Sequence, residues 1–296
     1  MKKSGKTNSA APAGYPIKGC LLKIRSLYPS MPKVHKRIAE KILKSPQEII
    51  KLPVTVLAAS VGVSEASIVL FCKKLGFRGY HDLKIVLAGE VYSSDSDIHE
   101  DIGSKDDPRS IVQKVFNTSI QTLRDTLKVL DGKAIETAAV LIENAEKVAI
   151  VGGGTSGIYA KDLWMKLSRI GLNVNFYDNQ TAMRMAAVVM KPGQVLFAIS
   201  HSGSTIAIVN TLQAARSLGV KTIGLTNYLK SPMTQYTDVL LLTSSRESGV
   251  REEEMTSRIA QLAVIDALFV AVANRSYERA SAMIKQTRAA VSDEKV

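Results

Sequence analysis

Short aliphatic runs alternate with longer helical segments through the second half of the chain. Short apolar runs rich in β-branched residues are typical of strands buried on both faces of a sheet. The alternation of strand and helix predicts an α/β domain built on a doubly wound parallel sheet. The runs are Val148 to Val151, Val174 to Tyr177, Val195 to Ile199, Thr222 to Leu225 and Val239 to Leu242.

Helical segments flank this pattern on both sides. Two precede the first strand, from near Ser110 to Leu130 and from Lys133 to Asn144. Two follow the last strand, Met255 to Ala273 and Tyr277 to Ala290. A polar stretch rich in Asp and Ser lies upstream and is typical of a linker. The expected domains are a disordered basic tail (residues 1–14), an all-α head (15–92), a linker (93–108) and the sheet-containing body (109–296).

The first 90 residues hold nearly all of the charge excess. Of the 39 Lys and Arg residues, 16 lie here against 5 acidic residues, a net charge of +11, whereas the rest of the chain carries +1. A front end this basic is suited to a polyanion such as DNA. Helices are expected from near Pro32 to Ser45, where Pro46 follows, and from Tyr80 to Glu90.

The sequence between these two helices predicts a helix-turn-helix. Thr55 caps the first helix, Gly62 supplies the turn, and Ser64 caps a second helix that ends at Gly76. A generic helical hairpin has the same pattern, but the local charge favours DNA binding. The inner face of the second helix is Ile68, Phe71, Cys72 and Leu75.

The outer face of the second helix is expected to enter the major groove. Lys73, Lys74, Arg78 and Lys84 are assigned to phosphates, which position a protein without reading sequence. Leu70 is suited to a thymine methyl group. The candidate DNA-binding residues are Ser64, Ala66, Ser67, Leu70, Lys73, Lys74 and Arg78.

A glycine-rich turn follows the first expected strand. Residues 152–157 match Gly-x-Gly-x-x-Gly, and Asp178 follows at the end of the next strand. This is the dinucleotide fingerprint, in which the glycines admit a pyrophosphate and the acid holds a ribose hydroxyl. An NAD-linked enzyme is therefore one alternative.

The third expected strand runs into a loop crowded with hydroxyl groups, residues 200–205, here called the hydroxyl loop. Hydroxyls and backbone N–H groups at a helix N-terminus form a compact site for a terminal phosphate. Helix capping alone is the simpler explanation, but the density of hydroxyls argues for a ligand. The candidate ligand-binding residues are Thr155, Ser156, Ser200, Ser202, Ser204, Thr205 and Glu253.

His201 stands among these hydroxyls and suggests a general base or an isomerase's acid. No paired acid accompanies it in the sequence, so a spacer or hydrogen-bond donor is favoured and no catalytic residue is assigned. Glu253, in an acidic run that opens a long helix, is the candidate for holding sugar hydroxyls. No metal site and no cofactor are expected.

Cys20 and Cys72 are the only cysteines and have no metal-ligand spacing, which favours a reducing, cytoplasmic compartment. The longest apolar stretch, Leu262 to Ala273, contains Asp266 and is shorter than the roughly 20 residues that span a bilayer. It is interpreted as a buried helix, and no membrane partner is expected.

Together these segments resemble the RpiR-type transcriptional regulators, in which a helix-turn-helix precedes a sugar isomerase (SIS) domain. The resemblance covers nearly the whole chain and is carried by residues 61–69, 71–77, 199–205 and 257–262. It implies that Ser200, Ser202, Ser204, Thr205 and Ser156 hold a phosphosugar. It also implies a homodimer or homotetramer on a palindromic operator. This chain departs from the family at Leu70, where relatives often carry a basic residue.

The resulting hypothesis is a cytoplasmic transcription regulator, not an enzyme. Its head binds operator DNA, and a phosphorylated sugar in the SIS domain changes that affinity through linkage. The alternatives are a phosphosugar isomerase with a basic appendage and, less favoured, the NAD-linked enzyme.

Overall fold

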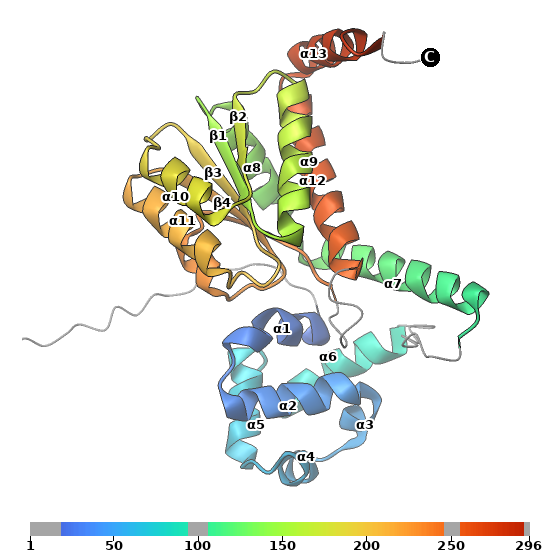
Figure 1. The fold of residues 1–296 in the computed structure, drawn as a ribbon. Coiled ribbons are helices and arrows are strands. Elements are labelled where there is room, and N and C mark those ends of the chain that lie inside the picture. Colours follow the sequence, from blue (N-terminus) through green and yellow to red (C-terminus); the bar gives the residue numbers. More distant parts are fainter. Residues whose placement is uncertain (1–18, 94–105, 246–254, 293–296) are drawn as a thin grey trace, which may run out of the picture.

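The computed structural model describes residues 19–93, 106–245 and 255–292, to which every structural statement here refers. The expected tail and most of the expected linker lie outside these ranges. Figure 1 shows a small helical head and a larger sheet-containing body. The head comprises α1 (Cys20–Leu27), η1 (Tyr28–Ser30), α2 (Lys33–Lys44), α3 (Pro46–Lys51), α4 (Val54–Val61), α5 (Glu65–Lys74) and α6 (Tyr80–Ser93).

Helices α4 and α5 form the expected helix-turn-helix, bent by 99° at the turn. Gly62 adopts φ +67°, a left-handed conformation that glycine reaches without strain. The Ser64 hydroxyl accepts a 3.2 Å hydrogen bond from the Ser67 N–H, so the predicted cap is confirmed. The prediction of a Thr55 cap is wrong. Pro53 is the extended N-cap residue, and α4 starts at Val54, two residues earlier than a Thr55 cap would place it.

The core of the head contains every residue predicted for the inner face of α5. Ile68, Phe71, Cys72 and Leu75 are all buried. Burial raises the pKa of the Cys72 thiol to about 12 and raises that of Cys20 as well. Both thiols are therefore protonated at neutral pH and act as small apolar side chains.

The body is a three-layer α/β fold. Its five strands are all parallel in the order β2-β1-β3-β4-β5 (Figure 1). The strands are β1 (Val148–Gly152), β2 (Val174–Tyr177), β3 (Val195–Ile199), β4 (Lys221–Thr226) and β5 (Val239–Leu242), and the helices are α7 (Pro108–Val129), α8 (Gly132–Glu143), α9 (Thr155–Arg169), α10 (Gln180–Val188), α11 (Ile206–Ser217), η2 (Pro232–Tyr236), α12 (Met255–Arg275) and α13 (Tyr277–Ala289).

Alternate strand residues pack on opposite helical layers, as strand geometry requires. In β1, Val148 and Ile150 belong to the core shared with α8, α9 and α12. Ala149 and Val151 belong to the core shared with α10 and α11. The sheet is therefore covered on both faces, as the continuous apolar strands predicted.

Helix α12 is a core helix of the body. Residues 257–275 are long and apolar enough to cross a membrane, with a mean hydropathy of 1.4. The apolar stretch Leu262 to Ala273, interpreted from the sequence as too short to span a bilayer, is only part of this helix. Its buried face carries Val264, Ile265 and Leu268, which pack into the core with α8 and α9. Helices α4 and α5 taken together are also long and apolar enough to cross a membrane, but they form the bent helix-turn-helix.

The head contacts the body through α1, a helix that the sequence did not predict. The Leu229 N–H of the body donates a 3.1 Å hydrogen bond to the Ser26 carbonyl. Arg25 lies 4.0 Å from the buried carboxylate of Asp125 on α7. Leu22 packs in a small apolar cluster with Val129, Leu229, Leu240 and Leu242. These contacts fix one end of the head against the end of β5 and α7.

Candidate functional site

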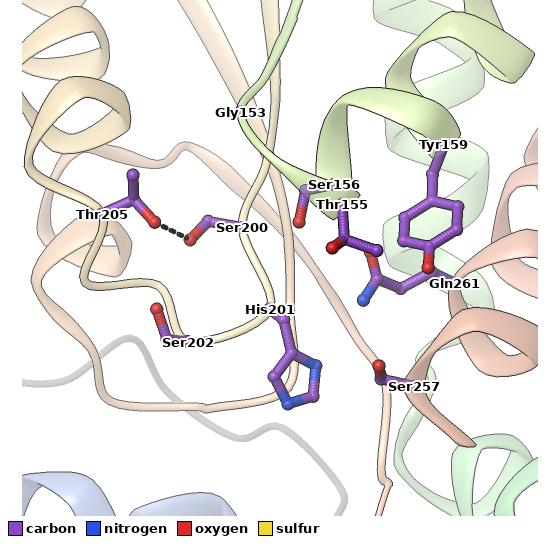
Figure 2. Close-up of a pocket in the computed structure, with 10 residues that line it drawn as sticks. All are labelled: Gly153, Thr155, Ser156, Tyr159, Ser200, His201, Ser202, Thr205, Ser257 and Gln261. Carbon is purple, nitrogen blue, oxygen red and sulfur yellow. Dashed lines mark hydrogen bonds between the residues drawn. The ribbon is translucent and has the colours of Figure 1, made fainter. Parts of the chain in front are cut away.

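A polar cavity of about 350 Å³ opens where β1 and β3 end side by side. The chain leaves these two neighbouring strands in opposite directions, toward β2 and toward β4. Ligands of open α/β sheets bind at such a switch point. Figure 2 shows the two facing loops and the start of α12 around the cavity. The lining residues are Gly153, Thr155, Ser156, Tyr159, Ser200, His201, Ser202, Thr205, Ser257 and Gln261.

Helix capping does not account for the position of the Thr205 side chain. Thr205 occupies the N-cap position of α11, yet its side chain makes no capping hydrogen bond. Its hydroxyl lies instead 3.1 Å from the Ser200 hydroxyl, within the cavity wall (Figure 2). The simpler explanation weighed from the sequence therefore does not hold for Thr205.

The hydroxyl loop is held in shape by its own short contacts. The Ser200 hydroxyl is buried and accepts a 3.1 Å hydrogen bond from the Gly203 N–H. Gly203 has φ +62°, and a Cβ there would collide with the side chain of Ser231. A glycine is therefore required for the loop to turn beneath the cavity.

Two helices point their N-termini at the cavity. Helix α9 begins at Thr155 and α11 begins at Ile206, directly after the hydroxyl loop. The N-terminus of a helix carries partial positive charge, and its first N–H groups have no intrahelical partner. The lining contains no Lys or Arg among the described residues. The arrangement suits an anionic group held by helix dipoles and hydroxyl donors.

Most of the predicted ligand-binding residues come together here. Thr155, Ser156, Ser200, Ser202 and Thr205 all line the cavity. The structure places Ser204 outside the lining, where its hydroxyl donates a 3.2 Å hydrogen bond to the Ser202 carbonyl. Glu253 lies outside the described residues. No group of three or more potential metal ligands occurs within the described ranges.

Tyr159, Ser257 and Gln261 also line the cavity, although no ligand-binding role was predicted for them from the sequence. Ser257 and Gln261 are four residues apart on one face of α12, a spacing that could have flagged them. The Gln261 side chain is 1% exposed, and its Oε1 atom has no hydrogen-bond partner within the described structure. An unpaired buried acceptor on a cavity wall is suited to a ligand donor.

The glycine fingerprint has a packing role. A Cβ on Gly152 would lie 2.7 Å from the Ser156 carbonyl and 2.9 Å from the Ala160 side chain. A Cβ on Gly157 would lie 2.9 Å from the Gly152 carbonyl. The glycines thus let α9 approach β1 closely. Asp178 does not line the cavity, so the residue that would hold a dinucleotide ribose is not part of this site.

The candidate DNA-binding residues form an exposed face on α5. Ala66, Lys73 and Lys74 are exposed, and Leu70 is 57% exposed. Ser67 is half-buried, and Ser64 is exposed at the cap. A bulky aliphatic side chain this exposed on a basic face is consistent with a base contact.

Two other basic residues of the head differ in the contacts of their side chains. The side chain of Arg78 is 93% exposed and lies 3.9 Å from the Asp82 carboxylate. Lys84, by contrast, donates a 3.2 Å hydrogen bond to the Leu52 carbonyl and lies over the Tyr80 ring. The assignment of Lys84 to a phosphate is therefore not supported by its position.

A helix-turn-helix head on a parallel-sheet body with a polar cavity at its switch point defines a DNA-binding protein with a ligand-binding domain. The helix-turn-helix domain of the rpiR family matches residues 18–94, and the SIS domain matches residues 141–271. An HTH-type transcriptional regulator of Caldanaerobacter subterraneus is 36% identical over 92% of this chain and 97% of that protein. The chain therefore belongs to the RpiR family of HTH-type transcriptional regulators.

Two further proteins are similar over most of their length. HexR, an HTH-type transcriptional regulator of Pseudomonas aeruginosa, is 31% identical over 88% of this chain and 90% of its own. The structure of Vibrio vulnificus NanR complexed with ManNAc-6P is similar in fold, with a TM-score of 0.60 and 24% identity. The match covers 94% of this chain and all of that one.

Proposed function

We propose that the cavity binds a phosphorylated sugar and that occupancy changes the affinity of the head for operator DNA. The position of the Thr205 hydroxyl is the main support for this proposal. This hydroxyl lies at the N-terminus of α11 but makes no capping hydrogen bond, and it lies 3.1 Å from the Ser200 hydroxyl in the cavity wall. The phosphate lies among Ser200, Ser202 and Thr205, and Thr155 and Ser156 face the sugar. Glu253 is proposed as a further sugar ligand.

The size and polarity of the cavity support a small polar ligand. Ligand pockets have volumes of about 300–1,000 Å³, and this cavity of about 350 Å³ lies at the lower end. A monosaccharide phosphate is of a suitable size, whereas an extended dinucleotide is not. ManNAc-6P, the compound complexed with NanR, therefore belongs among the compounds to be tested.

DNA binding is assigned to the exposed face of α5 and its surroundings. Ser64, Ala66, Ser67 and Leu70 are proposed to contact base edges or the adjacent backbone. Lys73, Lys74 and Arg78 are proposed to contact phosphates, because exposed cations at the end of a recognition helix lie close to the DNA backbone.

We further propose a cytoplasmic homodimer or homotetramer that binds a palindromic operator. Val112, Phe116 and Ile120 recur at every fourth position of α7 and are 57%, 65% and 46% exposed. Such an apolar stripe is unusual on a helix that faces only water. The proposed domain limits are residues 15–92 for the head and 109–296 for the body, with the linker between them. Light scattering of the purified chain measures the oligomeric state.

A ligand screen coupled to DNA binding tests the function. The purified protein is heated with glucose 6-phosphate, fructose 6-phosphate, ribose 5-phosphate, ManNAc-6P and NAD, and DNA affinity is measured on a duplex selected from a randomised library. At least one sugar phosphate is expected to raise the unfolding temperature and to change DNA affinity. Turnover of a sugar phosphate would favour an isomerase, and protection by NAD alone would favour the dehydrogenase alternative.

A further inference from the structure

The loop after β4, residues 227–231, lies between the cavity and the head. Its first part is bonded to the hydroxyl loop. The His201 carbonyl accepts hydrogen bonds from the Asn227 N–H at 3.1 Å and from the Thr226 hydroxyl at 2.9 Å. The rings of His201 and Tyr228 meet edge to face, with centroids 5.9 Å apart. Since His201 lines the cavity (Figure 2), Tyr228 contacts a residue of the cavity lining.

The next residue of this loop is bonded to the head. The Leu229 N–H donates to the Ser26 carbonyl at 3.1 Å, and the Leu229 side chain packs against the cluster that contains Leu22. Two adjacent residues therefore contact opposite partners, Tyr228 the cavity wall and Leu229 helix α1. A single peptide unit thus separates the residue that contacts His201 from the residue that contacts α1.

Helix α1 cannot move without the rest of the head. Cys20 and Ile24 are fully buried in the core of the head with α5 and α6 residues. The Glu90 carboxylate of α6 accepts hydrogen bonds from the N–H groups of Cys20 and Leu21 at the start of α1. A packed core transmits a displacement of α1 instead of absorbing it.

We propose that Tyr228 and Leu229 are the positioning residues that couple the cavity to the head, with Leu22 of α1 in the apolar cluster that receives Leu229. A ligand that contacts His201 in one arrangement of the hydroxyl loop favours the matching position of α1, and hence one orientation of α5. This inference rests on the proposed function and adds the route of regulation. The ligand shifts the equilibrium only by the difference in its affinity for the two arrangements.

The test measures coupling separately from binding. The probes are the selected duplex and whichever sugar phosphate of the panel changes DNA affinity most. The coupling factor is the ratio of DNA dissociation constants with and without that sugar phosphate. The wild-type factor is expected to lie between about 5 and 150, and Tyr228→Ala and Leu22→Ala each bring it within about twofold of one. Tyr228→Phe, which keeps the ring, retains the wild-type factor.

Sugar affinity is measured separately, in the absence of DNA. Tyr228→Ala is expected to keep the sugar affinity within about threefold of wild type, because the substitution removes the coupling between the cavity and the head and not a contact with the ligand. Leu218→Ala, at an exposed leucine after α11, is the matched control for Leu22→Ala and keeps the full coupling factor. Thermal unfolding identifies any variant that fails to fold, and the half-buried Tyr228 site tolerates truncation better than Leu22.

Two results overturn the inference. The first is full coupling in Tyr228→Ala and Leu22→Ala. The second is a loss of sugar affinity in Tyr228→Ala that matches its loss of coupling, which would make Tyr228 part of the binding site. A wild-type protein that responds to no sugar phosphate would instead refute the proposed function, so the two failures are separate.

Discussion

The hydroxyls of Ser200 and Thr205 lie 3.1 Å apart at opposite ends of the hydroxyl loop. Ser200 directly follows β3 and is buried, and Thr205 precedes α11. The pair closes the loop into a ring of polar groups beneath the cavity. Both hydroxyls can turn toward an incoming anion, because a hydroxyl rotates to suit its partner.

Removal of one hydroxyl from this ring is expected to abolish the sugar-phosphate response. Ser202→Ala and Thr205→Ala each lose a hydrogen bond to a charged group, which contributes about 1.5–3 kcal/mol, or about 10- to 150-fold in affinity. Calorimetric titration with the effective sugar phosphate measures this loss. DNA affinity in the absence of sugar is expected to stay at the wild-type value.

Ser204→Ala is the matched comparison within the same loop. Its hydroxyl is bonded to the Ser202 carbonyl and lies outside the cavity lining. A smaller loss of sugar affinity than in Ser202→Ala is expected. Equal losses would mean that Ser204 contacts the ligand, as the sequence alone predicted.

Gln261→Leu is expected to weaken the binding of sugar phosphates while inorganic phosphate binds as before. The substitution leaves a ligand hydroxyl buried without its acceptor, which costs about 1–3 kcal/mol, or about 5- to 150-fold in affinity. Competition by inorganic phosphate and by the sugar phosphate, measured separately, checks this. Gln286→Leu, at an exposed position of α13, is the control. Equal weakening of both ligands would place Gln261 at the phosphate.

Lys73→Ala and Lys74→Ala are each expected to weaken binding to all DNA sequences alike. Each lost phosphate contact reduces the slope of log affinity against log salt by about 0.9. Fluorescence anisotropy over a salt series, on specific and random duplexes, measures both effects. Lys191→Ala, an exposed lysine of the body, serves as the control. A slope that stays at the wild-type value would reject the phosphate assignments.

The stability of the head is expected to fall on acidification because of His35. Burial, and then the nearby Lys74, lower the pKa of this ring below its ordinary value of 6.5, where it packs against Phe71. The unfolded chain therefore binds the proton more readily, so stability is full above pH 6.5 and decreases as the pH falls toward the lowered pKa. Thermal unfolding of wild type and His35→Gln between pH 5 and 8 compares the two.

His81→Gln is the control for this pH series, since His81 is exposed on α6. It is expected to keep the wild-type decrease in stability, whereas His35→Gln reduces it. The same decrease in all three proteins would show that another group is responsible.

The sequence predicted the sheet and the helix-turn-helix because both depend on local pattern. Five apolar runs and the spacing of Gly62, Ser64 and Phe71 are visible without tertiary contacts. The role of Gln261 was not visible, since an unpaired acceptor is defined by groups brought together from distant parts of the chain. Helix α1 was missed for a related reason. Its stability comes from two apolar faces that pack on different domains and not from a single amphipathic stripe.

Helix α1 thus belongs to two cores at once, with Ile24 facing the head and Leu22 facing the body. An exchange of DNA-binding domains between relatives would replace α1 and so disrupt its packing against the body. A chimera is expected to keep its effector response only if the transplanted helix fits the leucines of its new host. Changes of operator specificity made within α5 alone avoid that requirement.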